Sequence, residues 1–285
     1  GLQIVNFADV ERPFIEGRAA MTGYPVEMYV VEDHAYVLLN HWRGYWRSNH
    51  DTRPERYEGG LLVSVNIEDP SNPYVVEKAR IPGHVQASRL TRAGDTVALY
   101  AAASWWGEYI NDDNEREHGS FTYVKSFGLT GGDIQARSEI NLGGYVGDIQ
   151  ATPDALLVSR LDWNHRTPKS TISLIDISNP DGTMTEGDEV EVLGYVANKY
   201  NMDLDGDILR VVSGAAWGNT RTNHLQTYDA SDFRNLVEID HATFGDGENL
   251  FATLFMGEKA FFVTYLQVDP FHAFHIDTEG IITEK

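Results

Sequence analysis

The sequence has no cysteine, few basic residues and no long apolar run, and each absence excludes a class of protein. Without cysteine, the 285-residue chain can form no disulfide framework, and no thiolate can act as a nucleophile or bind a metal. Lys and Arg total 22 against 43 Asp and Glu, a formal net charge of -21, which repels nucleic acid phosphates and anionic lipid surfaces. Because of this charge we expect no nucleic acid partner. Since no run of about eighteen apolar residues occurs, we also expect no membrane span in this chain.

The sequence is rich in aromatic residues and in short apolar runs, and residues 247–285 show the pattern most clearly. Four runs follow one another there, separated by turns such as Met256-Gly257-Glu258 and Asp277-Thr278-Glu279-Gly280. Runs of this length between tight turns are typical of strands. This stretch therefore predicts one four-stranded antiparallel sheet.

A segment similar to the third of these strands recurs along the chain. If Asn6, Asn66, Gly128, Asp176, Asp229 and His275 are taken as equivalent, the spacings are 60, 62, 48, 53 and 46 residues. This is the period of a four-stranded propeller blade with loops of variable length. The sequence therefore predicts an all-β protein, a β-propeller of four-stranded antiparallel blades.

About five and a half blades are visible, in a single domain of residues 1–285. Since the fifth blade already has four strands of its own, we expect the partial blade to belong to a larger ring and the chain to be part of a longer protein. The start at Gly1, without a signal-like segment, predicts a processed or excerpted product. The predicted boundaries are a partial blade at 1–22 and blades at 23–82, 83–142, 143–196, 197–244 and 245–285.

Three segments carry a resemblance to a known family. They are residues 24–30 (YPVEMYV), residues 81–89 (IPGHVQASR) and, most specifically, residues 255–270 (FMGEKAFFVTYLQVDP). The chain resembles the secreted bacterial and archaeal proteins that carry a C-terminal β-propeller domain, and its third strands resemble repeats built around Leu-Val-Ile-Val-Asp. The resemblance implies a propeller in a secreted, periplasmic or cell-surface protein, and it implies no catalytic residues. His275 departs from the Asp that is usual in this repeat.

All six tryptophans fall in the loops between the second and third strands of the first four blades. One interpretation is that each indole caps its own blade. The other is that the indoles, with His41 and Arg43 beside them in the first loop, bind a protein or glycan partner by stacking. The tryptophans are Trp42, Trp46, Trp105, Trp106, Trp163 and Trp217.

Two acidic segments are candidates for calcium binding. Asp112, Asp113 and Glu115 lie in a loop whose carboxylates could bind calcium or a transition metal, although a solvated loop is the favoured interpretation. The run 203–207 (DLDGD) resembles the opening of a calcium loop, but the repeat places it at the turn between the first and second strands. There, an Asp-Gly hairpin explains it without a metal.

We find no catalytic motif and predict an exported, non-enzymatic binding or scaffold module without a required cofactor. No Gly-x-Ser-x-Gly elbow occurs, and Glu27 and Asp148 are the only acid–base candidates near first strands. One alternative is a metal-assisted hydrolase or lyase that acts on polysaccharide or peptide. A further alternative is a structural subunit of a surface assembly.

Overall fold

The protein is built of β-strands, as predicted. A computed structural model describes residues 1–41, 43–45, 54–56, 59–110, 116–162, 169–214, 222–265 and 271–285. In these residues the only helical segment is one 3-10 turn, η1 (Lys199–Asn201). None of them forms a helix with the length and apolar content needed to cross a bilayer.

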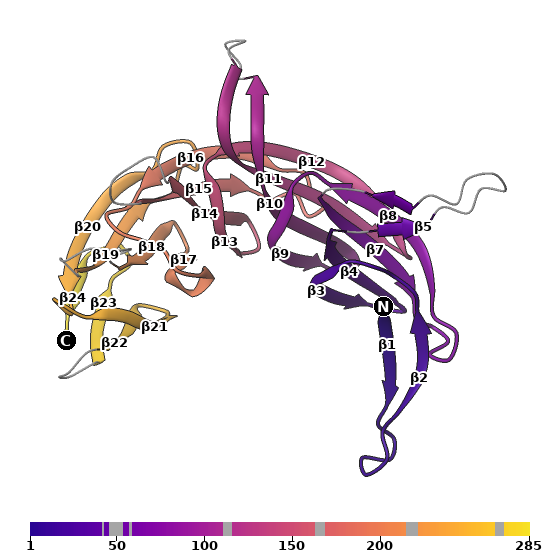
Figure 1. Cartoon of the computed structure of the whole chain (residues 1–285). Helices are drawn as coiled ribbons and strands as arrows, with labels where there is room; N and C mark the ends of the chain where they lie inside the picture. Colours follow the sequence, from indigo (N-terminus) through magenta and orange to yellow (C-terminus); the bar gives the residue numbers. More distant parts are fainter. Residues whose placement is uncertain are drawn as a thin grey trace. The chain divides into compact units, whose positions relative to one another are not determined.

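The chain divides into two compact units, which are described separately. The first comprises residues 1–119, 123–141 and 180–183, and the second comprises residues 120–122, 142–179 and 184–285. Each predicted blade corresponds to one antiparallel sheet whose strands lie side by side in chain order (Figure 1).

The first unit contains the two-stranded partial blade and most of the first two complete blades. Its strands are β1 (Leu2–Asn6) and β2 (Phe14–Ala19); β3 (Tyr24–Val31), β4 (His34–Asn40), β7 (Gly60–Asn66) and β8 (Tyr74–Ile81); and β9 (His84–Ala93), β10 (Thr96–Ile110), β11 (Arg116–Thr130) and β12 (Asp133–Gly143). A separate small pair, β5 (Arg43–Tyr45) and β6 (Pro54–Arg56), lies within the connection between β4 and β7.

The second unit contains the other three complete blades. Its strands are β13 (Tyr145–Ala151), β14 (Ala155–Asp162), β15 (Lys169–Asp176) and β16 (Thr185–Glu191); β17 (Met202–Asp205), β18 (Ile208–Ser213), β19 (Asn223–Asp229) and β20 (Val237–Phe244); and β21 (Asn249–Met256), β22 (Lys259–Tyr265), β23 (Phe271–Ile276) and β24 (Ile282–Glu284).

The cores of both units lie between neighbouring sheets. In the first unit, Tyr36 and Leu62 of one blade and Leu99 and Phe127 of the next belong to one fully buried cluster. Inner strands such as β7 are buried along almost their whole length because sheets cover both of their faces, whereas the fourth strand β8 alternates between exposed and covered positions. Full burial of such a side chain contributes roughly 1.5–3 kcal/mol. Packing between blades therefore contributes to the stability of the fold.

The residue that ends the third strand has a shared role in four of the blades. The side-chain oxygen accepts a hydrogen bond from the backbone N–H two residues later, an Asx turn. At Asp229, the hydrogen bond from the Ser231 side chain and then this bond from the Ser231 N–H lower the pKa of the carboxyl. This bonding explains why Asn or Asp recurs at the position. The pairs are Asn6 with Ala8 (2.8 Å), Asn66 with Glu68 (3.2 Å), Asp176 with Ser178 (2.9 Å) and Asp229 with Ser231 (2.9 Å).

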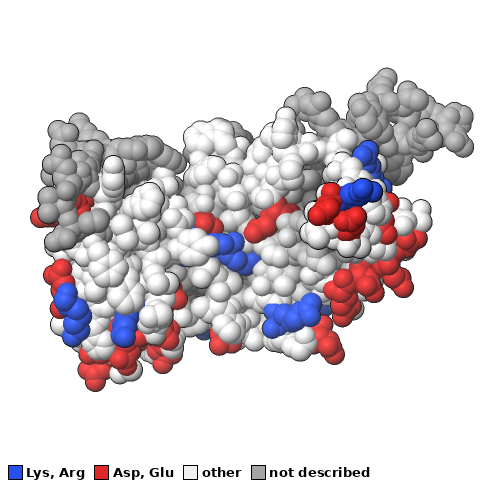
Figure 2. All heavy atoms as spheres, turned by 90° about the horizontal axis from the view of Figure 1, so that it is seen from below, with Lys and Arg blue, Asp and Glu red and all other residues white. Residues whose placement is uncertain are grey.

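Acidic side chains gather toward the lower edge of the view in Figure 2, with fewer basic ones among them. The turns between first and second strands also carry acidic residues, including Glu32, Asp33 and Asp205. The surplus of 43 acidic over 22 basic residues is thus displayed partly at the turns. This distribution agrees with a surface that repels polyanions.

Candidate functional site

One end of the first complete blade brings four segments into register. Tyr24 lies opposite Asn40, Asn40 opposite Gly60, and Gly60 opposite Ile81. The connection from β4 to β7 and the connection from β8 to the next blade both leave from this end. It is the end on which the sequence predicts a binding surface.

The side chain of Asn40 fastens this end to the neighbouring blade. Its amide donates a hydrogen bond to the carbonyl of Val85 (2.8 Å), and its oxygen accepts one from the N–H of Val85 (2.9 Å). A side chain on Gly60 would not fit here, because a Cβ would lie 2.4 Å from Cγ2 of Val85. Both partners of Asn40 belong to the backbone, so the link holds β4 and β9 in a defined position.

Gly83 brings the end of β10 close to the same place. Its φ is +78°, and a Cβ would lie 2.5 Å from the carbonyl oxygen of Ser104, so both conformation and space require glycine. The next residue, His84, pairs with Ser104 across the ladder. Trp105 follows directly, so its position relative to His84 is set by strand pairing.

Three aromatic rings meet beside this link. The ring of His41 contacts that of Tyr24 edge-on, with centroids 5.7 Å apart, and that of His84, with centroids 4.2 Å apart. His41 has a φ of +49°, a left-handed conformation that few non-glycine residues adopt, and its N–H donates to the carbonyl of Gly59 (3.2 Å). This unusual backbone directs the chain out of β4 while the imidazole stays against its two neighbours.

Trp105 and Trp106 follow Ser104 on β10, and as successive residues of a strand they project their side chains to opposite sides of it. Trp106 is 70% exposed and Trp105 is 45% exposed, and Tyr24 is also 70% exposed. A Cβ on Gly107 would lie 2.3 Å from Cζ2 of Trp105, so that indole lies along the backbone of its own strand. Strands β10 and β11, each of 15 residues, continue past the rest of their sheet as a hairpin (Figure 1). We call this end of the two blades, which carries Tyr24, His41, His84, Trp105 and Trp106, the aromatic face.

The structure therefore brings together only some of the predicted site residues. His41, Trp105 and Trp106 belong to the aromatic face, and Arg43 lies in β5, where only its backbone is described. The remaining predicted binding residues, Trp42, Trp46, Trp163 and Trp217, and the predicted metal ligands, Asp112, Asp113 and Glu115, lie outside the described residues.

Sequence reasoning missed two members of the aromatic face, Tyr24 and His84. Each lies at the start of the first strand of its blade, and neither is in the loops on which the tryptophan pattern depends. Only the packing of β3 beside β9 shows that they approach His41. An aromatic residue at the first position of a first strand would have been the available signal.

The Asp203–Asp207 run forms a hairpin, as predicted, and an arginine explains its carboxylates. Asp205 pairs with Ile208 across a turn in which Gly206 has a φ of +58°. The guanidinium of Arg210, buried on β18, forms an ion pair with Asp203 and lies 3.3 Å from the carboxylate of Asp205. Alternate residues of a strand share one face, so both carboxylates reach this cation.

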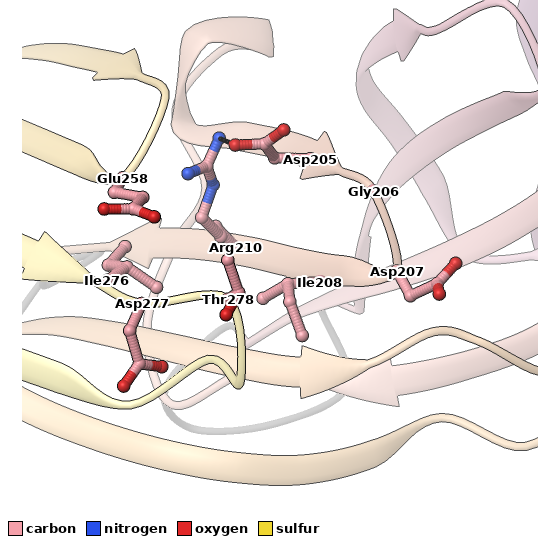
Figure 3. A pocket seen from close by; sticks show the side chains of 9 residues that line it. All are labelled: Asp205, Gly206, Asp207, Ile208, Arg210, Glu258, Ile276, Asp277 and Thr278. Atoms are coloured by element: carbon pink, nitrogen blue, oxygen red, sulfur yellow. Dashed lines mark ion pairs between the residues drawn. The ribbon is translucent and has the colours of Figure 1, made fainter.

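A cavity of about 230 Å³ opens beside this arginine (Figure 3). Glu258 and Asp277 line it from the fifth blade, and Asp207 points away from Arg210. Arg210 also donates to the carbonyl of Gly257 and lies 5.3 Å from the ring centroid of Phe255. The guanidinium thus has several partners and holds two blades together. The described residues include no group of three or more His, Asp or Glu side chains arranged to hold a metal.

The two acid–base candidates take part in structural hydrogen bonds. Glu27 accepts a hydrogen bond from the hydroxyl of Ser88, which lies 3.0 Å from the hydroxyl of Tyr29. Burial raises the pKa of Tyr29 to about 12, with the charge of Glu27 adding to the effect. Asp148 accepts from the N–H of Lys199 (2.9 Å). Both carboxylates therefore position neighbouring segments.

Comparisons with known proteins agree on the architecture. A family model described as a beta propeller domain matches residues 106–279, more than half of the chain. No curated protein matches the sequence. The structure is similar to that of a functionally unknown protein from Desulfotomaculum acetoxidans DSM 771, with a TM-score of 0.50 and 13% identity, covering 93% of this chain and 70% of that one.

A second solved structure, a hypothetical selenium-binding protein from Sulfolobus tokodaii, matches with a TM-score of 0.38 and 8% identity, covering 89% of this chain and 74% of that one. Identities this low bear on the fold and not on activity, and the second likeness carries no argument. The family match and the five four-stranded sheets lead to the same conclusion. The chain belongs to the beta propeller domain family.

Proposed function

We propose that this protein is an exported, non-enzymatic binding module that holds a protein or glycan partner on its aromatic face. The observation that carries the proposal is the exposure of Trp106 and Tyr24, each 70%, at one end of a rigidly joined pair of blades. Large aromatic side chains supply most of the contact energy where a partner desolvates them.

The hydrogen bonds beneath the aromatic face favour a binding role, because they hold its residues in defined positions. Asn40 bonds both backbone groups of Val85, and strand pairing fixes His84 opposite Ser104. A surface that is already organised loses little conformational entropy when a partner binds. The imidazoles of His41 and His84 add polar groups that can hydrogen-bond a sugar hydroxyl or a peptide group.

The alternative interpretation of the tryptophans, packing within their own blade, fits Trp105 better than Trp106. The indole of Trp105 lies against Gly107 and is 45% exposed, whereas Trp106 is 70% exposed. The two residues therefore allow the two interpretations to be compared within one strand.

The test uses two kinds of ligand, a panel of neutral oligosaccharides and a phage-displayed peptide library, each selected on the wild-type protein. For a selected ligand, Trp106→Ala and Tyr24→Ala should each weaken binding by about 2 kcal/mol or more if these residues are central contacts. The matched control is Tyr74→Ala: Tyr74 is 59% exposed and lies at the opposite end of the same sheet, so the affinity should not change.

Thermal unfolding of each variant separates binding from packing. If Trp106→Ala lowers the melting temperature strongly while the folded fraction keeps the wild-type affinity, the packing interpretation holds and the proposal fails. If neither ligand class yields a binder that depends on the aromatic face, the binding role is also excluded for these classes.

A further inference from the structure

Two histidines in the fourth complete blade approach each other closely. Nδ1 of His224 on β19 lies 3.0 Å from Nε2 of His241 on β20. The ring centroids are 5.2 Å apart with 30° between the ring planes. His224 pairs with Thr243 and His241 pairs with Gln226, so the two imidazoles are diagonal neighbours on one face of the sheet.

This distance suits two ligands of one metal ion. An imidazole nitrogen binds Zn²⁺ at about 2.0–2.1 Å, so two such nitrogens lie about 3.3 Å apart in tetrahedral geometry and about 2.9 Å apart as neighbours in a square plane. The observed 3.0 Å lies between these values. Without a metal, one of these two ring nitrogens carries a hydrogen atom and donates it in a hydrogen bond to the other.

An acidic side chain lies near the pair. The carboxylate of Asp246 interacts electrostatically with His224, so a negative charge lies close to the pair. That charge attracts a cation.

We propose that His224 and His241 bind a divalent transition-metal ion, Cu²⁺ more tightly than Zn²⁺. Imidazole nitrogens suit both ions, and affinity rises toward Cu²⁺ in the usual order. Because the described part of the chain has no group of three or more metal-binding side chains at one place, this pair supplies two protein ligands, and water completes the coordination. Such an open site exchanges its ion, unlike the closed four-ligand sites that stabilise small folds.

The proposal is tested by titrating Cu²⁺ and Zn²⁺ into the purified protein, with the bound ion followed by calorimetry and, for Cu²⁺, by electron paramagnetic resonance. The wild type should show a Cu²⁺ signal with two imidazole nitrogens. His224→Gln and His241→Gln should each weaken this binding at least about tenfold, since loss of even a supporting group around a metal costs that much. The matched control is His275→Gln in the next blade, which should keep the signal.

A second measurement needs no substitution and therefore does not depend on how the variants fold. The ring protons of the ten histidines are followed by nuclear magnetic resonance while substoichiometric Cu²⁺ is added. The resonances of His224 and His241 should broaden together and before that of His275. Unchanged titrations in both variants, or earlier broadening of other histidines, would overturn the proposal.

Discussion

The side chain of Asn40 forms two hydrogen bonds with the backbone of Val85, one to its carbonyl and one from its N–H, across a sequence separation of 45 residues. It thus replaces a strand partner at the junction of two blades. An unpaired backbone group at a part-buried junction lowers the stability of the folded protein. This one side chain therefore helps to fix β4 against β9.

Asn40→Ala should lower the free energy of unfolding by about 1–3 kcal/mol, since both backbone groups of Val85 lose their partner. Asn40→Asp keeps the shape but cannot donate to the carbonyl of Val85, and we expect it to be destabilising as well. Urea unfolding measures both variants. Wild-type stability in Asn40→Asp would show that the bond to the carbonyl contributes nothing.

Gly83→Ala should be clearly more destabilising than Gly94→Ala. Both glycines have positive φ, +78° and +59°, but only at Gly83 would a Cβ collide with another segment, 2.5 Å from the carbonyl oxygen of Ser104. We expect Gly94→Ala to lower the free energy of unfolding by about 1 kcal/mol, and Gly83→Ala to lower it by about 1–3 kcal/mol more. Thermal or urea unfolding checks the difference, and equal losses would contradict the close approach.

Arg210→Met should destabilise the protein by about 2–3 kcal/mol, because it leaves Asp203 and Asp205 without their cation. This is less than for a fully buried pair, because these carboxylates are 29% and 53% exposed and water screens them. Arg210→Lys keeps the charge but loses the forked geometry, so its loss should be smaller. We expect the urea midpoint to be lowest for Arg210→Met, intermediate for Arg210→Lys and highest for the wild type. Any other order would contradict this account of the ion pair.

The stability of the protein should fall as the pH rises from about 10 toward 12, partly because of Tyr29. Burial raises the pKa of this hydroxyl from 10.0 to about 12 in the folded protein, so the unfolded chain loses the proton first. The stabilising contribution is complete below pH 10 and disappears as the pH passes through the folded value. Tyr29→Phe should make urea midpoints less dependent on pH in this range, while Tyr74→Phe should not. An unchanged dependence in Tyr29→Phe would show that Tyr29 does not contribute.

Much of the fold could be predicted because it depends on residues close together in the sequence. Asn66 and Asp176 end third strands because their side chains bond the backbone two residues later, and Gly206 permits a two-residue hairpin. Such local chemistry leaves a repeating pattern. The period of the blades followed from this pattern alone.

The contacts of the candidate site could be predicted only in part, because they depend on register between strands. The predicted loop position of Trp105 and Trp106 is wrong, because strand β10 continues through both residues to Ile110. The meeting of His41 with His84 depends on the packing of two sheets. The pair of His224 and His241 is 17 residues apart and requires the diagonal alignment of two strands. No spacing rule along one chain reveals a contact of that kind.

The Asx turns that end the third strands also bear on the order in which the chain folds. Each such turn closes over two residues, whereas the Asn40 bonds close over 45, so the loss of chain entropy is far smaller at the turns. We expect the corners of the blades to form early and the docking of neighbouring blades to come late. Stopped-flow kinetics should then give a φ-value for Asp176→Ala well above that for Asn40→Ala.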